Sequence, residues 1–326
     1  SLMVWNANPM SQAPDSNKVE RGLARDDLFT VVSEHFMTDT ARYADLVLPA
    51  TMAAEQDDIL TSWGNFYINL NCKAIDAPGE TVPNVELFRR LAQRMGFGDD
   101  PRFTLSDIEL LREVLDWDDP LLVDQSFDTL LDKGTIRVSV PPPDEYSPHA
   151  EGNFPTPSGK CEFVSDLGFK VGFVAPPLRQ GRVDRMNSMP IERVPDYTEN
   201  RESNAELRNP LQLLSTKSHG FLNSQYANEA HKSKAQGKQT VMINPVDAIK
   251  RDINNGSEVQ IQNQRGKLIG IAKVSDKVLA GTVVATFGYW TSQNKAGAVN
   301  ALTTASIGFA GTPSFYDVAV ELVPLK

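Results

Sequence analysis

Two short apolar runs near the start of the chain constrain its fold more than any other feature. Residues 28–33 (LFTVVS) and residues 45–49 (DLVLP) are rich in β-branched and aliphatic side chains. Such runs are typical of strands that are buried on both faces of a parallel sheet. A helical pattern precedes the first run, and a second short helix at residues 38–43 lies between the two. We therefore predict a Rossmann-like α/β domain with a parallel sheet in residues 1–133.

Loops at the carboxyl ends of parallel strands are the usual ligand sites of such domains. In this chain they are residues 6–10, 34–40 and 50–58, and the first two are polar. A plain Asn/Pro turn, a solvated strand end and helix capping by Thr38 or Asp39 are the alternative explanations. The candidate nucleotide contacts in these two loops are Asn6, Asn8, Pro9, Glu34, His35, Thr38 and Thr40.

The middle of the chain changes from helical to proline-rich. Amphipathic patterns predict helices at residues 84–95, 106–117 and 126–133, which we expect to cover the sheet or an outer face. Residues 134–205 then carry repeated prolines and few helical patterns. That composition predicts an extended connector on the surface, with one strand at residues 160–164.

Residues 206–326 are predicted to be mostly β-structure, because short strand patterns recur at regular spacing. Several short strands of this kind suggest a small closed barrel. A helix at residues 245–251 has proline in its first turn, and Arg265-Gly266 is a hairpin signal. The strand candidates are residues 211–216, 240–243, 258–262, 267–274 and 282–287.

A dense polar cluster follows the first of these strands, within LQLLSTKSHGFLNSQYAN at residues 211–228. A segment that leaves a strand and at once concentrates donors and acceptors is better suited to gripping a polar ligand than to packing a core. We expect the aromatic pair Tyr289 and Trp290 to be core or to line the barrel mouth. The candidate contacts in the polar cluster are Lys217, Ser218, His219, Asn223 and Ser224.

Composition excludes several classes of function. The formal net charge of −10 argues against a nucleic-acid partner. The sequence lacks a run of about 18 apolar residues, so we expect no direct membrane insertion. Cys72 and Cys161 cannot ligate an iron–sulfur cluster alone, and we expect two unpaired thiols at packed positions rather than a disulfide. The chain opens inside a strand pattern, so we expect it to be a piece of a longer protein.

Several stretches resemble the molybdopterin oxidoreductase family, the dimethyl-sulfoxide-reductase class of molybdenum or tungsten enzymes. Residues 34–49 (EHFMTDTARYADLVLP) are similar to the TxTAxxAD and VLP segment of that family's third domain, and VWNANP resembles its WGxNP loop. Residues 209–326 resemble the family's C-terminal dinucleotide-binding domain, a six-stranded double-psi barrel. The linker piece TPSGKCEF is similar to the family's TPSGKxEF. Together these pieces cover nearly the whole chain in the family's order.

The resemblance implies that the chain is the C-terminal, cofactor-binding portion of an oxidoreductase. The implied cofactor of the full protein is bis-molybdopterin guanine dinucleotide with molybdenum or tungsten, and a [4Fe-4S] cluster is allowed in the N-terminal part. No part of this chain matches the family half that ligates the metal, so we expect neither a metal ligand nor a catalytic residue here. We expect no cofactor on this portion alone, and no activity.

The resemblance also assigns roles to barrel residues. Lys217 would offset the charge of the pyrophosphate or of a reduced dithiolene, and His219 would hydrogen-bond the pterin. Asn300, in VNALT, would be a second pterin or nucleotide contact. The implied partners are the N-terminal half of the same protein and an electron-transfer subunit. The implied location is the cytoplasm, or the periplasm if the N-terminus carries a twin-arginine signal.

Two other functions are compatible with parts of the sequence. The large iron–sulfur subunit of respiratory NADH dehydrogenase is similar in the TxTAxxAD–VLP region and carries no molybdenum. A non-catalytic electron-transfer or scaffold subunit of that kind would explain residues 1–58 but not the barrel motifs. A free-standing barrel that binds proteins or peptides would leave the α/β half unexplained.

Overall fold

The computed structural model describes residues 1–162, 210–292, 297–305, 315 and 318–325. They group into two compact units. The first holds Ser1–Val31, Met37–Asp45 and the described part of Phe163–Lys326, and the second holds Val32–Phe36 and Leu46–Glu162. This grouping cuts across the predicted boundaries at residues 133 and 205, which remain a prediction about domains.

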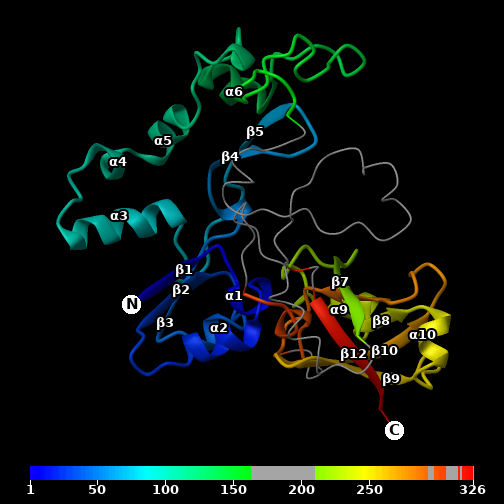
Figure 1. The fold of residues 1–326 in the computed structure, drawn as a ribbon. Coiled ribbons are helices and arrows are strands. Elements are labelled where there is room, and N and C mark those ends of the chain that lie inside the picture. The colour runs from blue at the N-terminus through cyan, green and yellow to red at the C-terminus, as the bar shows by residue number, and fades with distance from the viewer. Residues whose placement is uncertain (163–209, 293–296, 306–314, 316–317, 326) are drawn as a thin grey trace. The chain divides into compact units, whose positions relative to one another are not determined.

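The start of the chain forms a three-stranded sheet in the order β1 (Leu2–Trp5), β2 (Thr30–Glu34) and β3 (Leu46–Pro49). The sheet is parallel, as predicted from the two apolar runs. The Asp45 amide donates to the Thr30 carbonyl, and further along the same pair of strands the Ala50 amide donates to the Glu34 carbonyl. Figure 1 shows these strands beside the blue helices that follow β1.

Two helices follow β1 where one was predicted. The chain turns at once into α1 (Pro9–Gln12), because Pro9 fixes a helical φ at the first position, and then into α2 (Ser16–Leu23). The Asp15 side chain caps α2 by accepting from the Lys18 amide. The predicted helix at residues 38–43 is only a 3₁₀ turn, η1 (Ala41–Tyr43).

A second sheet was not predicted from the sequence. It is antiparallel, in the order β4 (Asp58–Thr61), β5 (Tyr67–Asn71) and β6 (Thr135–Arg137). The last of these strands lies in the segment that was predicted to be connector, so that prediction is wrong at its start. Ile136 is 3% exposed and packs in a small core with Ile68, Leu122 and Leu130, which explains why residues 135–137 pair as a strand ahead of the prolines that follow them.

Short helices fill the rest of the second unit. The predicted helix at residues 84–95 is confirmed as α3 (Asn84–Met95), which ends at Gly96 in a left-handed conformation. The helix predicted at residues 106–117 was too long, because α5 (Asp107–Glu113) ends at Glu113. Ser106 and Glu109 form its capping box, and α4 (Pro101–Thr104) precedes it. The remaining elements are η2 (Ala53–Glu55), η3 (Pro120–Leu122) and α6 (Phe127–Lys133).

The C-terminal part of the chain is a closed six-stranded barrel, as predicted (Figure 1). The strand order is β10-β8-β11-β7-β12-β9, and β10 pairs with β9 to close it. The pairs β10–β8 and β11–β7 are parallel, and the other four are antiparallel. The strands are β7 (Leu211–Lys217), β8 (Thr240–Ile243), β9 (Glu258–Gln262), β10 (Lys267–Val274), β11 (Thr282–Phe287) and β12 (Val318–Pro324).

Alternating side chains build the barrel core. In β7, Leu211, Leu213 and Ser215 are buried while the residues between them are not, which is the period-two pattern of a strand with one face inward. One cluster of aliphatic residues from all six strands fills the interior, and Leu302 of the last loop belongs to it. The connecting elements are α9 (Ala230–Gln236), which was not predicted, α10 (Pro245–Ile249) and η5 (Val299–Ala301).

One hydrogen bond within the first unit gives a pH-dependent prediction. The Tyr43 hydroxyl donates to Glu20 Oε1 at 2.5 Å, and this bond raises the pKa of Tyr43 to about 12. Because the folded pKa lies above the ordinary value of 10.0, the stability from this bond is complete below pH 10 and is lost as pH rises toward 12. We expect Tyr43→Phe to remove one late-ionising tyrosine from an ultraviolet absorbance titration and to flatten the loss of stability between pH 10 and 12. The exposed Tyr67→Phe is the control, and an unchanged late step in Tyr43→Phe would contradict the assignment.

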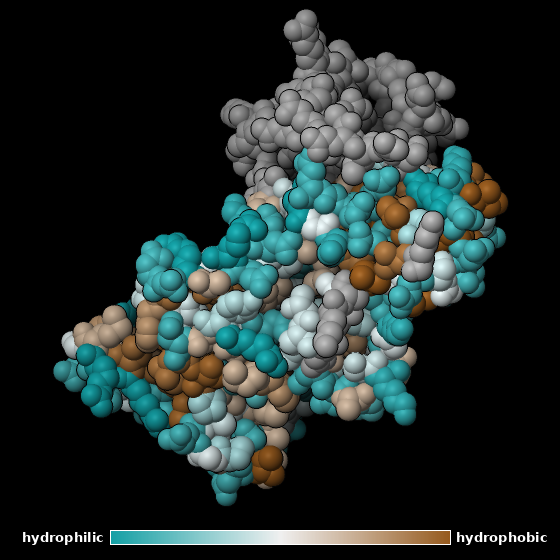
Figure 2. All heavy atoms as spheres, turned by 90° about the horizontal axis from the view of Figure 1, so that it is seen from below, coloured by the Kyte–Doolittle hydropathy of each residue, from teal (hydrophilic) through white to brown (hydrophobic). Residues whose placement is uncertain are grey.

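Three further findings concern the surface, the cysteines and the helices. Apolar side chains lie in small groups among hydrophilic ones on the face drawn in Figure 2. Cys72 and Cys161 are unpaired, as predicted, but both are exposed, so the prediction of packed positions is wrong. Within the described parts of the chain, no helix has the length and apolar character needed to cross a membrane.

Candidate functional site

A buried pair of polar side chains joins the two predicted loops of the first unit. Asn8 and Thr40 are 3% and 0% exposed. The Thr40 hydroxyl donates to Asn8 Oδ1 at 2.7 Å and accepts from the Met10 amide at 3.1 Å. Asn8 Nδ2 in turn donates to Ser11 Oγ at 3.2 Å. Both side chains are thus occupied within the protein, and they fix α1 against the loop after β2.

The neighbouring predicted contacts divide into structural and exposed positions. Thr38 is buried and accepts from the Ala41 amide at 3.1 Å, so it caps the 3₁₀ turn. Pro9 starts α1, whereas Asn6 is exposed in a left-handed conformation with φ of 52°. In the second unit, His35 is exposed and its Nε2 lies 2.8 Å from the Thr51 carbonyl, while Glu34 accepts from the His35 amide.

The polar loop after β7 is folded on itself. Ser218 Oγ accepts from the amides of Gly220 and Phe221, both at 3.1 Å, which turns the chain directly after the strand. The backbones of Leu222 and Gln225 then exchange two hydrogen bonds, so Asn223 and Ser224 form the tip of a tight turn. Asn223 adopts φ of 55°, a conformation that asparagine tolerates better than most residues.

This fold of the loop separates the predicted contacts by exposure. Ser218 and Ser224 are 8% and 4% exposed; the Ser218 hydroxyl bonds within the loop, and the Ser224 hydroxyl accepts from Gln12. Lys217 and His219 are exposed, and Asn223 is partly exposed. These three side chains are therefore the ones of the predicted barrel cluster that a ligand can reach.

The predicted loops of the α/β part meet the barrel loops along one line of contacts, which we call the seam. Gln12 Nε2 donates to Ser224 Oγ at 3.1 Å across it. The Asp39 carboxylate, 3% exposed, accepts from the Thr291 amide at 2.6 Å, from the Thr291 hydroxyl at 2.8 Å and from the Ser292 amide at 3.2 Å. All these residues belong to the first compact unit.

Asn300 lies on the same seam. Its Nδ2 donates to the carbonyls of Ser11 and Ala13, both at 3.0 Å, which fixes the plane of the amide. The side chain is 2% exposed, and its Oδ1 has no donor within hydrogen-bond distance among the described residues. A buried acceptor without a donor costs about 1–3 kcal/mol, so its retention here is consistent with a role in binding.

A cavity of about 540 Å³ opens on the seam, between α2 and the β9–β10 hairpin. Asn17 and Glu20 line it from α2, and Arg265 and Lys267 line it from the barrel. The Arg265 Nε donates to the Leu302 carbonyl at 2.9 Å, and none of the ion pairs between described residues involves this guanidinium. Burial lowers the pKa of Arg265, an effect that the charge of Asp15 partly offsets. The half-buried cation makes this cavity suitable for an anionic group.

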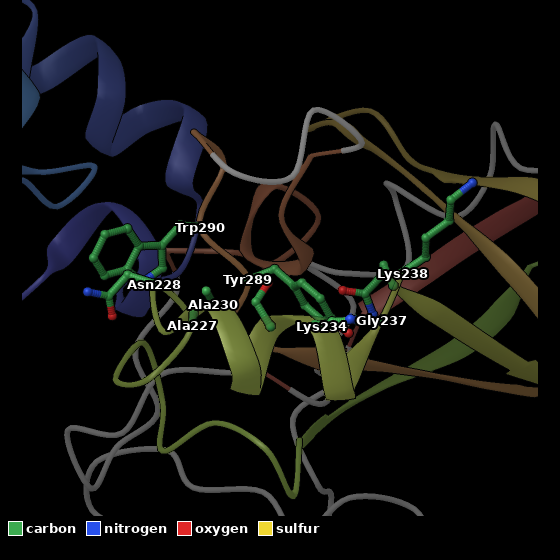
Figure 3. A pocket seen from close by; sticks show the side chains of 10 residues that line it. Ala227, Asn228, Ala230, Lys234, Gly237, Lys238, Tyr289 and Trp290 are labelled. Atoms are coloured by element: carbon green, nitrogen blue, oxygen red, sulfur yellow. The ribbon is translucent and has the colours of Figure 1, made fainter.

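A second cavity, of about 630 Å³, lies beside α9 on the barrel (Figure 3). Trp290 and Asn228 stand together on one side of it, Tyr289 and Lys234 lie in the middle, and Lys238 points away at the other end (Figure 3). Trp290 is 5% exposed and packs on Phe221 and Ala227, so the indole is mainly core, as expected of this aromatic pair. None of the predicted site residues lines either cavity.

Sequence reasoning missed the residues that join the two parts. Asp39 and Gln12 make side-chain bonds across the seam, as does Asn17, whose Nδ2 donates to the Arg265 carbonyl at 2.7 Å. Asp39 was considered only as a helix cap. No local pattern distinguishes such a carboxylate from a helix cap, because its partners Thr291 and Ser292 lie about 250 residues away in the chain. Across the described segments, no group of three or more His, Cys, Asp or Glu side chains is arranged to hold a metal ion.

Comparison with known proteins matches both parts of the chain to one family. Residues 2–94 match the family model described as molybdopterin oxidoreductase, and residues 211–319 match the model described as molydopterin dinucleotide binding domain. The probable oxidoreductase YoaE of Bacillus subtilis (strain 168) is 36% identical over 325 residues, which cover 99% of this chain and 44% of that protein. The dimethyl sulfoxide reductase DmsA of Escherichia coli (strain K12) is 29% identical over 93% of this chain and 39% of its own length.

A solved structure shows the same fold. Acetylene hydratase from Pelobacter acetylenicus aligns with a TM-score of 0.70 at 20% sequence identity, over 99% of this chain and 44% of that one. The chain thus spans less than half the length of the relatives that it matches. The two matched regions together cover more than half of this chain, and the chain belongs to the molybdopterin oxidoreductases of the dimethyl-sulfoxide-reductase class.

Proposed function

We propose that this chain is the C-terminal, cofactor-binding portion of a molybdenum or tungsten oxidoreductase that carries bis-molybdopterin guanine dinucleotide. The observation that carries the proposal is the seam, where the polar loops of the α/β part and of the barrel are hydrogen-bonded to each other. A long cofactor with a pterin at one end and a nucleotide at the other needs polar groups from more than one loop. Two different folding units that meet through such loops can supply them.

The residues present fit this cofactor. Pterin and guanine both carry amino and ring N–H donors, and Asn300 Oδ1 is a buried acceptor that lacks a donor among the described residues. The cofactor's pyrophosphate is anionic, and the seam cavity holds the half-buried Arg265 guanidinium. Lys217, His219 and Asn223 would bind the cofactor from the barrel loop, and Asn6 from the α/β part. Glu34 and His35 belong to the second unit and stay candidate contacts from the sequence alone.

The chemistry of the full protein would come from the bound metal and its dithiolenes, which support two-electron transfer or oxygen-atom transfer. This chain's residues would bind and orient that group and hold its polar atoms away from water. The barrel's two parallel and four antiparallel strand pairs support the finer assignment of a double-psi barrel. Relatives named as reductases of dimethyl sulfoxide and trimethylamine N-oxide suggest a reductase of a small oxidised substrate.

We also propose partners and a location for the full protein. One relative, from Halobacterium salinarum, is named as the putative catalytic subunit of a dimethyl sulfoxide reductase. We infer that the full protein works with an electron-transfer subunit and that this chain packs against the remainder of its own polypeptide. We place the protein in the cytoplasm, or in the periplasm if a twin-arginine signal precedes it.

The experiment that tests this function is cofactor analysis of the full-length protein, expressed anaerobically. We expect molybdenum or tungsten together with two guanine nucleotides per metal, released on denaturation. The variant His219→Ala with Asn223→Ala should lower the cofactor content several-fold, because it removes two reachable contacts. His231→Ala, an exposed histidine on α9, is the matched control and should keep the content.

The same experiment separates the competing function. A scaffold or electron-transfer subunit like that of NADH dehydrogenase would contain no guanine nucleotide, and its activity would survive loss of His219 and Asn223. A pure preparation with neither metal nor guanine nucleotide would reject the proposed function.

A further inference from the structure

Hydrogen bonds across the seam close into a circuit. Gln12 accepts from the Asn8 amide at 3.5 Å through its Oε1, and its Nε2 donates to Ser224 Oγ at 3.1 Å. The Ser224 carbonyl accepts from the Trp290 indole Nε1 at 2.7 Å. Trp290 is followed in the chain by Thr291, which leads to the other half of the circuit.

The second half returns to the α/β part. The Thr291 amide and hydroxyl both donate to Asp39 Oδ2, and Asp39 is followed by Thr40. The Thr40 hydroxyl donates to Asn8 Oδ1 at 2.7 Å, which closes the circuit at the residue where it began. The path crosses the seam twice, once through Gln12 and once through Asp39, and each member is buried or partly buried.

The circuit holds the tip of the barrel loop. Asn223, one of the reachable candidate contacts, directly precedes Ser224, which receives bonds from both Gln12 and Trp290. The Asn223 carbonyl lies so close to Gly288 that a Cβ built there would be 2.3 Å away. The tip is therefore fixed by polar bonds on one side and by close backbone packing on the other.

We propose that Gln12 and Asp39 are positioning residues that together fix the Asn223–Ser224 tip relative to the α/β loops. Cofactor retention then depends on the closed circuit rather than on each bond alone. This inference rests on the proposed function, because it assigns the circuit's purpose to the cofactor of that site. Neither residue needs to touch the cofactor. When one of the two crossings is broken, the Asn223–Ser224 tip can rotate about the remaining crossing. Breaking the second crossing as well therefore adds little to the rate of cofactor release.

The test is a double-mutant cycle in the full-length protein. Gln12→Ala removes the first crossing, and Asp39→Asn replaces one of the two acceptor oxygens with a donor, which must then face either the Thr291 amide or the Ser292 amide. We expect each variant to release guanine nucleotide about tenfold faster than the parent. The double variant should release it less than about threefold faster than the faster single variant, whereas independent bonds would make it about tenfold faster than either single variant.

Two matched variants distinguish positioning from general destabilisation. Asp45→Ala removes a bond of 2.7 Å to the Thr30 amide that lies outside the circuit and outside the seam cavity, and it should lower the unfolding midpoint while changing release by less than about twofold. Gln12→Glu should preserve retention, because the Ser224 hydroxyl can donate to a carboxylate at that position. Release rates that multiply when both crossings are removed, or a release rate that rises as much in Asp45→Ala, would overturn the proposal.

A second readout does not depend on the cofactor. Hydrogen exchange of the amides from 221 to 227 should lose protection in each single variant and no further in the double variant. If the parent protein contains no guanine nucleotide, the proposed function and the retention claim both fail, and exchange still decides whether the circuit exists. If the parent holds the cofactor and both single variants retain it normally, only the positioning claim fails.

Discussion

Leu302→Ala is expected to destabilise the barrel by about 2–5 kcal/mol. Leu302 has no exposed surface and belongs to the aliphatic cluster of the barrel interior. Its removal leaves a cavity, because the six paired strands around it cannot move inward without breaking their register. The measurement is the opening free energy of the barrel in the full-length protein, from native-state hydrogen exchange of the β10 and β11 amides.

The same substitution should also loosen the candidate site. The Leu302 carbonyl accepts from Asn263 Nδ2 at 2.8 Å and from Arg265 Nε at 2.9 Å, and Leu302 follows η5, which contains Asn300. Leu279→Ala makes the same chemical change at a side chain that is 70% exposed, and it should change the opening free energy by less than about 0.5 kcal/mol. Similar costs at the two positions would show that Leu302 is not part of a packed core.

Gly288→Ala is expected to cost about 2–5 kcal/mol and to displace the Asn223–Ser224 tip. Gly288 has φ of 110°, and a Cβ there would lie 2.3 Å from the Asn223 carbonyl oxygen. The backbone of the loop must therefore move, so cofactor content should fall together with stability. Denaturation midpoints and guanine nucleotide content of the full-length protein measure the two effects.

Gly256→Ala is the control that separates the cost of the steric clash at Gly288 from the cost of a positive φ. Gly256 also has a positive φ, of 85°, but nothing lies within 4 Å of the position that its Cβ would take. We expect a cost of about 1–2 kcal/mol from conformation alone, with unchanged cofactor content. Equal losses in both variants would mean that the approach of Gly288 to Asn223 does not matter for the site.

The sequence predicted the main elements of both parts because their signals are local. The continuous apolar run at β2 and the alternation in β7 correspond to burial on two faces and on one face respectively. The antiparallel pair of β4 and β5 is local and was missed despite the turn at Gly64 between them. The third strand, β6, was missed because it lies more than 60 residues after β5 in the chain. No local pattern reports a pairing of that range, and the prolines after β6 suggested a connector instead.

The candidate site was predicted at the level of loops but not of individual roles. Thr40, Asn8 and Ser224 were expected to face a ligand, yet their side chains bond within the protein. Polarity in a loop predicts hydrogen bonding without saying whether the partner is a ligand or another loop. Asn300 shows both kinds of partner in one side chain. Its Nδ2 donates to a carbonyl across the seam, while its Oδ1 has no donor among the described residues and is free to accept from a ligand.

The central claim is that the α/β loops and the barrel loop grasp one cofactor together. Hydrogen–deuterium exchange of the full-length protein, with the cofactor and after its removal, tests this claim most directly. The account predicts that the amides of residues 6–12 and of residues 218–228 gain protection together when the cofactor is bound. Protection of only one of these two segments would contradict the claim.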